Sequence, residues 1–104
     1  MNFAALTQTD KPVLVDFHAD WCAPCRAMRP ILDDVTAYLG DQAVVLKIDV
    51  DRHQELARQH GVRSIPTFIV FQNGKPLWRK TGMISSYELV EVIRQIISLE
   101  PVHS

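Results

Sequence analysis

Two cysteines separated by only two residues are the part of this sequence most able to do chemistry. Cys22 and Cys25 are the only cysteines among the 104 residues, and Ala23 and Pro24 lie between them. Thiols at this spacing can close into a disulfide or open into a dithiol, and a CxxC beside alternating strands and helices indicates redox chemistry. A bridge that closes so short a loop would stabilise the fold by only about 2 kcal/mol. A purely structural disulfide is therefore disfavoured.

The two thiols have different predicted roles because a helix is expected to begin beside them. Cys22 would lie at the N-terminal end of this helix, where unpaired N–H groups and the helix dipole favour an anion. Its thiolate is therefore the expected accessible nucleophile. Cys25 returns to the same helical face three residues later and can attack a mixed disulfide that Cys22 makes with a substrate.

Asp16 is the one acidic residue in an otherwise apolar and aromatic run at residues 13–18. Burial in such a strand would raise the pKa of its carboxyl and let it exchange a proton near neutral pH. We expect a general base that deprotonates Cys25 through water. The alternative is a hydrogen-bonded aspartate needed only for folding or solubility. Lys47 could pair with Asp16 from a neighbouring strand, although a lone charge on a strand is more often solvated.

His18, four residues before Cys22, raises the question of a metal site. Three potential ligands fall short of the four that a structural zinc site normally requires. The remaining histidines, His53, His60 and His103, have no motif spacing to the cysteines. We therefore expect no metal. The imidazole of His18 could instead tune the redox pair by titrating near the thiolate, or it could be an ordinary residue at the end of a strand.

Composition and charge narrow the class of protein. The chain is 47% hydrophobic and 22% charged with a net charge of −1, which suits a soluble domain with one core and gives no general attraction to nucleic acid or anionic lipid. The N-terminus does not resemble a signal peptide, and no apolar run is long enough to span a bilayer. We expect a single domain over residues 1–104, monomeric and cytoplasmic, without nucleic-acid or membrane partners.

A long amphipathic helix is predicted over residues 22–39. Its apolar side chains recur at spacings of four, three and four, at Met28, Leu32, Val35 and Leu39. Pro24 fits the first turn, whereas Pro30 should kink the helix. Gly40 is the expected C-terminal stop.

The other predicted elements alternate between strands and helices. Strands are expected at residues 13–18, 43–50, 67–72 and 77–81, and helices at residues 2–8, at 52–60 with Asp51 as N-cap, and from a Ser85/Glu88 capping box to Pro101. The first two strands are expected to be buried, and parallel with a right-handed crossover. Asn73-Gly74 predicts a tight hairpin between the last two.

These motifs together resemble the thioredoxin family. The resemblance covers residues 13–98 in order, through Val15-Asp16-Phe17, Trp21-Cys22-Ala23-Pro24-Cys25-Arg26, Pro30-Ile31-Leu32, Val62-Arg63-Ser64-Ile65-Pro66-Thr67 and the segment from Asn73 to Gly82. It implies an α/β thioredoxin fold, in which a central mixed four-stranded sheet is flanked by helices. The family's usual first strand is expected to be missing or reduced.

The resemblance also implies an activity. Members reduce protein disulfides by dithiol–disulfide exchange through the positions of Cys22 and Cys25, and the proline between the cysteines resembles the reducing members. The implied partners are disulfide-containing client proteins and a thioredoxin reductase that supplies electrons from NADPH, with no cofactor bound by this chain beyond its redox-active disulfide. The alternatives are a disulfide oxidase or isomerase with the same site, or a redox-independent binding subunit.

A substrate-binding rim is implied around Cys22. Its expected members are Trp21, Ala23, Pro24, Ile65, Pro66, Thr67, Gly82 and Met83, with main-chain hydrogen bonds to a bound segment near Ile65 and Thr67. Pro66 matches the family's cis-proline. Only about 5–6% of X-Pro bonds in folded proteins are cis, so this expectation rests on the resemblance. Ala23 and His18 stand where many members have glycine and tryptophan, and both are expected to bear on redox tuning or partner choice.

Overall fold

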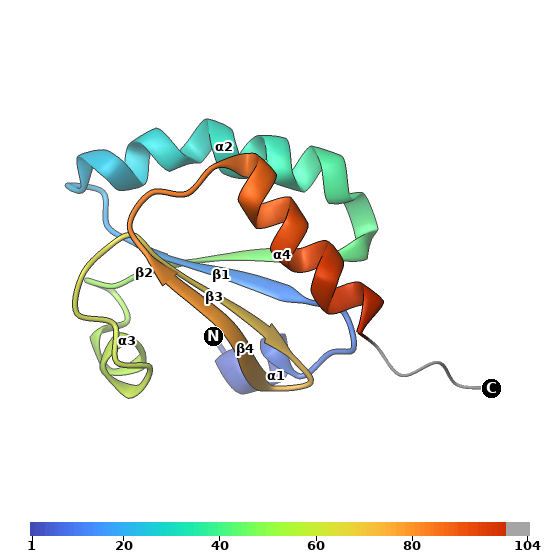
Figure 1. The fold of residues 1–104 in the computed structure, drawn as a ribbon. Coiled ribbons are helices and arrows are strands. Elements are labelled where there is room, and N and C mark those ends of the chain that lie inside the picture. Colours follow the sequence, from blue (N-terminus) through green and yellow to red (C-terminus); the bar gives the residue numbers. More distant parts are fainter. Residues whose placement is uncertain (100–104) are drawn as a thin grey trace.

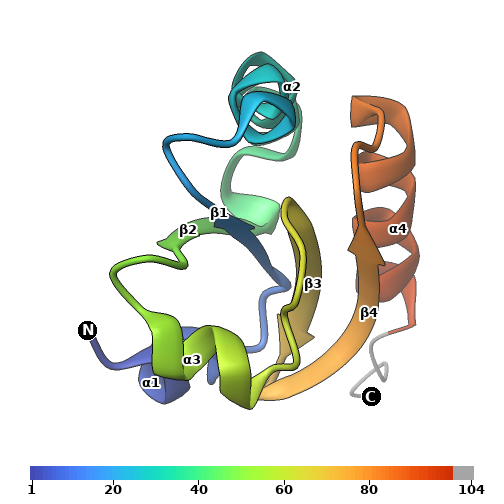
Figure 2. The same ribbon diagram turned by 90° about the vertical axis from the view of Figure 1, so that its left-hand side faces the viewer.

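The computed structural model describes residues 1–99 as a sheet between two layers of helices (Figure 1). Helices α2 and α4 cover one face, and α1 and α3 lie on the other (Figure 2). The elements in chain order are α1 (Phe3–Thr7), β1 (Val13–His18), α2 (Ala23–Leu39), the 3₁₀ helix η1 (Gly40–Gln42), β2 (Val44–Asp49), α3 (Gln54–Gln59), β3 (Thr67–Gln72), β4 (Lys75–Thr81) and α4 (Ser86–Ser98). The predicted helix end at Pro101 lies outside the described residues.

The sheet is mixed and four-stranded, as predicted. Its strand order is β2-β1-β3-β4, with β1 parallel to β2 and antiparallel to β3. The β3–β4 hairpin turns at Asn73 and Gly74, which have φ angles of 52° and 77°. Positive φ at both positions is what a tight hairpin needs. Within the described part of the chain, the segment before β1 holds α1 and no strand.

The prediction that the second strand is buried is wrong. Of the residues in β2, only Ile48 is buried, and Val44 is 42% exposed. The reason is position, because β2 pairs only with β1 and forms one edge of the sheet. Apolar β-branched residues suit a half-covered strand as well as a covered one, so its composition does not distinguish an edge strand from a central one.

The larger core lies between the sheet and the pair α2 and α4. The predicted stripe of α2 is buried together with Cys25, and it packs with Leu14 and Val70 of the sheet and with Leu89 and Ile93 of α4. The helix continues past Pro30 and stops at Gly40, where φ is 56°. The kink at Pro30 stays a prediction.

The smaller core lies under α1 and α3. It contains Phe17 and Phe71 from the sheet, and Phe3 of α1 packs against it with its ring edge-on to Phe71, 5.3 Å between centroids. The N-terminal segment is also tied to the hairpin, since the N–H of Gly74 donates to the carbonyl oxygen of Thr7 at 3.0 Å. These contacts hold α1 against the sheet. The helix spans Phe3–Thr7, close to the predicted range of residues 2–8.

Ser85 and Asp51 were both predicted to cap a helix through their side chains, and the prediction for Asp51 is wrong. Ser85 caps α4 as expected, with its hydroxyl accepting from the N–H of Glu88 at 3.1 Å. Asp51 does not cap α3, which begins at Gln54 with His53 at the N-cap and no side-chain capping bond. The Asp51 carboxylate is instead engaged by Trp21. Among residues 1–99, no helix is both long and apolar enough to cross a bilayer.

Truncating Leu89 to alanine should destabilise the fold strongly. Its side chain is fully buried in the larger core, and loss of a buried leucine side chain costs about 2–5 kcal/mol through lost burial and the cavity left behind. Urea unfolding measures this cost. The matched control is Leu77→Ala, because Leu77 is 50% exposed and should change the free energy of unfolding by less than about 1 kcal/mol. Equal costs at the two sites would contradict the packing described.

Candidate active site

The junction between β1 and α2 positions both cysteines. β1 ends at His18, and Cys22 is the N-cap of α2, with its Sγ accepting from the N–H of Cys25 at 3.2 Å. Pro24 occupies the first turn, where a missing N–H costs nothing. Cys22 and Cys25 form a disulfide with their Cα atoms 5.2 Å apart. Cys22 therefore lies at the helix N-terminus, as expected, and its role as the nucleophile stays a prediction.

The two sulfurs differ in the space they face rather than in exposure. We expected Cys22 to be the accessible thiol, but in this oxidised form Cys22 is 4% exposed and Cys25 is 5% exposed. Cys22 lines a surface cleft of about 490 Å³, whereas Cys25 lines a separate small cavity toward the sheet. Their predicted roles, attack and resolution, correspond to these two sides.

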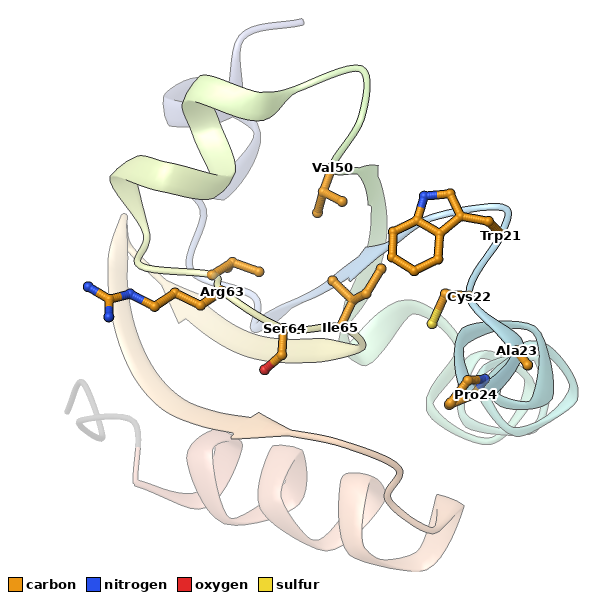
Figure 3. Close-up of a pocket in the computed structure, with 9 residues that line it drawn as sticks. Trp21, Cys22, Ala23, Pro24, Val50, Arg63, Ser64 and Ile65 are labelled. Carbon is orange, nitrogen blue, oxygen red and sulfur yellow. The ribbon is translucent and has the colours of Figure 1, made fainter.

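The cleft beside Cys22 is apolar and is built from three segments far apart in sequence (Figure 3). One wall is the β1–α2 junction, the second is Val50 after β2, and the third is the loop before β3. Its lining residues are Trp21, Cys22, Ala23, Pro24, Val50, Val62, Arg63, Ser64 and Ile65. The cleft is open to solvent and continuous with the disulfide, so a partner chain could reach Cys22 through it.

Trp21 is held at the mouth of this cleft by a hydrogen bond. Its indole Nε1 donates to the Asp51 carboxylate at 2.8 Å, although the residue is 68% exposed. Asp51 is itself in a tight turn in which its N–H donates to the Asp49 carboxylate at 2.9 Å. The turn after β2 therefore orients the large apolar side chain next to Cys22.

Only part of the predicted rim lines the cleft. Trp21, Ala23, Pro24 and Ile65 do, whereas the other four predicted members, Pro66, Thr67, Gly82 and Met83, do not. Sequence reasoning missed Val50, Val62, Arg63 and Ser64 as lining residues. Val62, Arg63 and Ser64 directly precede Ile65 in the sequence. Their inclusion in the rim could therefore have been predicted from that of Ile65. Val50 carried no such signal.

The four remaining rim residues lie at the start of β3 and in the segments next to β3 and β4. The Ile65–Pro66 bond is cis, as the resemblance implied, and Pro66 is buried. The carbonyl oxygen of Pro66 accepts from the N–H of Gly82 at 2.8 Å, which ties the two loops together. Thr67 is buried, and its hydroxyl donates to the carbonyl oxygen of Ser64 at 2.6 Å. Met83 is 51% exposed. Their roles in binding stay predictions.

Asp16 lies behind the disulfide with its carboxyl almost completely buried. It is 4% exposed, and its Oδ1 has no hydrogen-bond partner in the described structure. Burial raises the pKa of the Asp16 carboxyl from 3.8 to about 6, against the opposing charges of His18 and Lys47. The carboxyl can therefore exchange a proton near neutral pH, as the proposed general base must.

Asp16 shares the small cavity with Cys25, with His18 and with Lys47, which the sequence offered as its possible partner and as a second residue that could tune the redox pair. The cavity measures about 20 Å³ and is lined by Asp16, His18, Ala19, Cys25, Arg29 and Lys47. Lys47 is the register partner of Asp16 across β2 and β1, and no ion pair joins them in the described structure. The structure thus brings the predicted base and the predicted resolving thiol together with His18 and Lys47. Within residues 1–99, no three His, Cys, Asp or Glu side chains are grouped to hold a metal.

Comparison with known proteins agrees with this geometry. The thioredoxin family model matches residues 1–95 of the chain. This chain belongs to the thioredoxin family. A mutant thioredoxin from Halobacterium salinarum superposes with a TM-score of 0.80 at 36% identity, covering 92% of this chain and 82% of that chain. The thioredoxin fold predicted from the motifs is confirmed.

Thioredoxin-family relatives differ from this chain in length. Thioredoxin Y, chloroplastic, from Oryza sativa subsp. japonica is 42% identical over 94 residues, which are 90% of this chain and 56% of the relative. A bifunctional thioredoxin reductase/thioredoxin from Mycobacterium leprae is 40% identical over 95 residues, 91% of this chain and 21% of that protein. The chain therefore spans just over half of the rice protein and about a fifth of the mycobacterial one.

Replacing Asp16 with asparagine should raise the free energy of unfolding at pH values above the pKa of the Asp16 carboxyl, which is about 6. Since the folded-state pKa of about 6 exceeds the ordinary 3.8, the folded protein holds this proton more tightly, and the ionised carboxyl lowers stability as pH rises through that window. A shift of this size corresponds to about 3 kcal/mol. Urea unfolding of the oxidised protein should show Asp16→Asn to be more stable by about 2–3 kcal/mol at about pH 8, with the gain vanishing toward about pH 4.

The matched control for this prediction is Asp33→Asn. Asp33 is an exposed carboxylate on α2, so its replacement should leave the pH dependence of unfolding unchanged. Two results would contradict a raised pKa for the buried Asp16 carboxyl. One is that Asp16→Asn gives no stabilisation at about pH 8, and the other is that it gives the same stabilisation at about pH 8 and about pH 4.

Proposed function

We propose that this protein is a thiol–disulfide oxidoreductase that reduces the disulfides of client proteins. The observation that carries the proposal is the Cys22–Cys25 pair at the N-terminus of α2, bordered by an open apolar cleft on one side and by Asp16 on the other. Membership of the thioredoxin family supports the same activity.

The reaction starts from the dithiol and proceeds in two exchanges. The Cys22 thiolate attacks one sulfur of a client disulfide, the client S–S bond breaks, and a mixed disulfide forms while the other client sulfur leaves as a thiolate. The Cys25 thiol loses its proton and attacks Cys22 Sγ, which releases the second client sulfur. The client gains two electrons and two protons, and the protein is left with the Cys22–Cys25 disulfide.

The surroundings of each sulfur suit its step. Cys22 Sγ lies at a helix N-terminus and accepts an N–H bond, an arrangement that stabilises a thiolate. Cys25 shares a small cavity with Asp16, whose pKa of about 6 lets the carboxylate accept a proton near neutral pH. Asp16 is thus the proposed general base for resolution.

Return to the dithiol requires an electron donor. We propose a thioredoxin reductase that draws on NADPH, with no cofactor held by this chain. The mycobacterial relative, whose name joins thioredoxin reductase with thioredoxin in one protein, supports such a partnership. A single domain, a monomeric state and a cytoplasmic location stay predictions from the sequence, and the rice relative is named as chloroplastic.

Single cysteine variants should separate the two exchanges. Cys25→Ser should accumulate a mixed disulfide with a client because nothing resolves it, whereas Cys22→Ser should form none and lose turnover by more than about a hundredfold. Non-reducing electrophoresis and a client-reduction assay measure these outcomes. The double serine variant tests the binding-subunit alternative. If the variant without both cysteines still performed the protein's function in cells, that function would be binding and the redox proposal would be wrong.

Equilibration with glutathione buffers should place the protein among the reductants. Strong disulfide oxidants have potentials of about −120 mV and isomerases about −180 mV, whereas thioredoxins themselves lie near about −270 mV. We expect a value below about −220 mV, read from the fraction of Cys22–Cys25 disulfide at each ratio of reduced to oxidised glutathione. A value at or above about −180 mV would favour the oxidase or isomerase alternative.

A further inference from the structure

The cavity behind the disulfide has an inner and an outer side. Asp16 and Cys25, 4% and 5% exposed, form its inner side. The outer side is made by half-buried His18 and by exposed Arg29 and Lys47. A polar cavity of about 20 Å³ is large enough for one water-sized molecule. The cavity therefore joins the buried carboxyl to side chains that solvent can reach.

Three elements contribute the charged groups that face Asp16. His18 lies on the same face of β1, two residues on, because strand side chains alternate. Lys47 approaches from β2 as the register partner, and Arg29 comes from α2. The β3 register partner, Phe68, is uncharged. Asp16 is thus the only carboxylate lining the cavity, surrounded by basic side chains on its outer side.

The two permanent cations cannot carry a proton outward. Guanidinium and ammonium groups have no free acceptor at neutral pH. Arg29 is also turned toward Asp20, with its guanidinium 3.8 Å from the carboxylate. A neutral imidazole has one acceptor and one donor nitrogen, so it can take a proton on one nitrogen and release a proton from the other. His18 is therefore the one outer side chain able to receive a proton from Asp16 and release it.

Asp49, the neighbour of His18 on β2, does not hold the imidazole away from the cavity. Asp49 is its register partner on β2, but the Asp49 carboxylate is occupied by its own turn. Its Oδ1 accepts from the N–H of Asp51 at 2.9 Å, and its Oδ2 pairs with Arg52 at 3.9 Å. The imidazole at the end of β1 is thus left to face the cavity.

We propose that His18 is a positioning residue that acts through Asp16. It carries the proton that Asp16 takes from Cys25 out to solvent during the resolution step. This inference rests on the proposed function. In the step, the Cys25 proton passes to the Asp16 carboxylate, the Cys25 thiolate attacks Cys22 Sγ, and the bond between Cys22 and the client sulfur breaks. His18 takes the proton from Asp16 and delivers it to solvent, where the released client thiolate is protonated.

The test follows the two exchanges separately in the reduced full chain. A symmetrical aryl disulfide that liberates a coloured thiolate gives one equivalent when Cys22 attacks and a second when Cys25 resolves, and only the first phase depends on reagent concentration. His18→Gln keeps a polar side chain that cannot carry a proton, and His18→Ala leaves room for added imidazole. His53→Gln is the control, because His53 is a half-buried imidazole at the α3 N-cap with no capping bond.

We expect His18→Gln to slow the second phase about tenfold near neutral pH while the first phase stays within about twofold. Added imidazole should restore the second phase of His18→Ala in proportion to its concentration, and His53→Gln should behave as the parent chain. A second phase at the parent rate in His18→Gln, or a slow phase in His18→Ala that imidazole leaves unchanged, overturns the proposal. Absence of the first phase in the parent chain would overturn the proposed function as well.

Discussion

The structure depends on the position of β1 in the middle of the sheet. This strand hydrogen-bonds to β2 on one edge and β3 on the other, and helices cover both of its faces. Every side chain from Val13 to Phe17 is therefore buried, including the carboxyl of Asp16. A buried carboxylate oxygen without a hydrogen-bond partner is costly, and here the carboxyl of Asp16 lines the same cavity as Cys25. The core thus contains a group that stability alone would not favour, at the place where the proposed chemistry needs a base.

The disulfide separates two environments with different proposed tasks. On the Cys22 side, an open apolar cleft between Trp21 and Ile65 suits contact with another protein. On the Cys25 side, a cavity of about 20 Å³ contains a carboxyl, an imidazole and two fixed cations, and suits the movement of protons. Because Cys22 caps α2 and Cys25 lies in its first turn, a single N-terminal turn of the helix orients each sulfur toward its own side.

Local pattern predicted most of the elements and half of the site. The α2 stripe, the Asn73-Gly74 hairpin and the Ser85 cap were predicted correctly, because periodicity, turn chemistry and capping depend on residues close in sequence. The burial of β2 and the capping role of Asp51 were predicted wrongly. Both depend on distant partners, since β2 is exposed by its edge position and Asp51 is engaged by Trp21, thirty residues earlier in the chain.

The sequence by itself determined the chemistry that this protein can attempt, through two thiols at helix-turn spacing, an aspartate inside an apolar strand and a set of motifs specific enough to name a family. Only the tertiary structure decided which groups meet. It placed Asp16, His18, Arg29 and Lys47 around one cavity and brought Val50 and Ile65 to the cleft. The physical reason is that sheet register and helix packing, and not sequence spacing, set the distances between side chains on different elements.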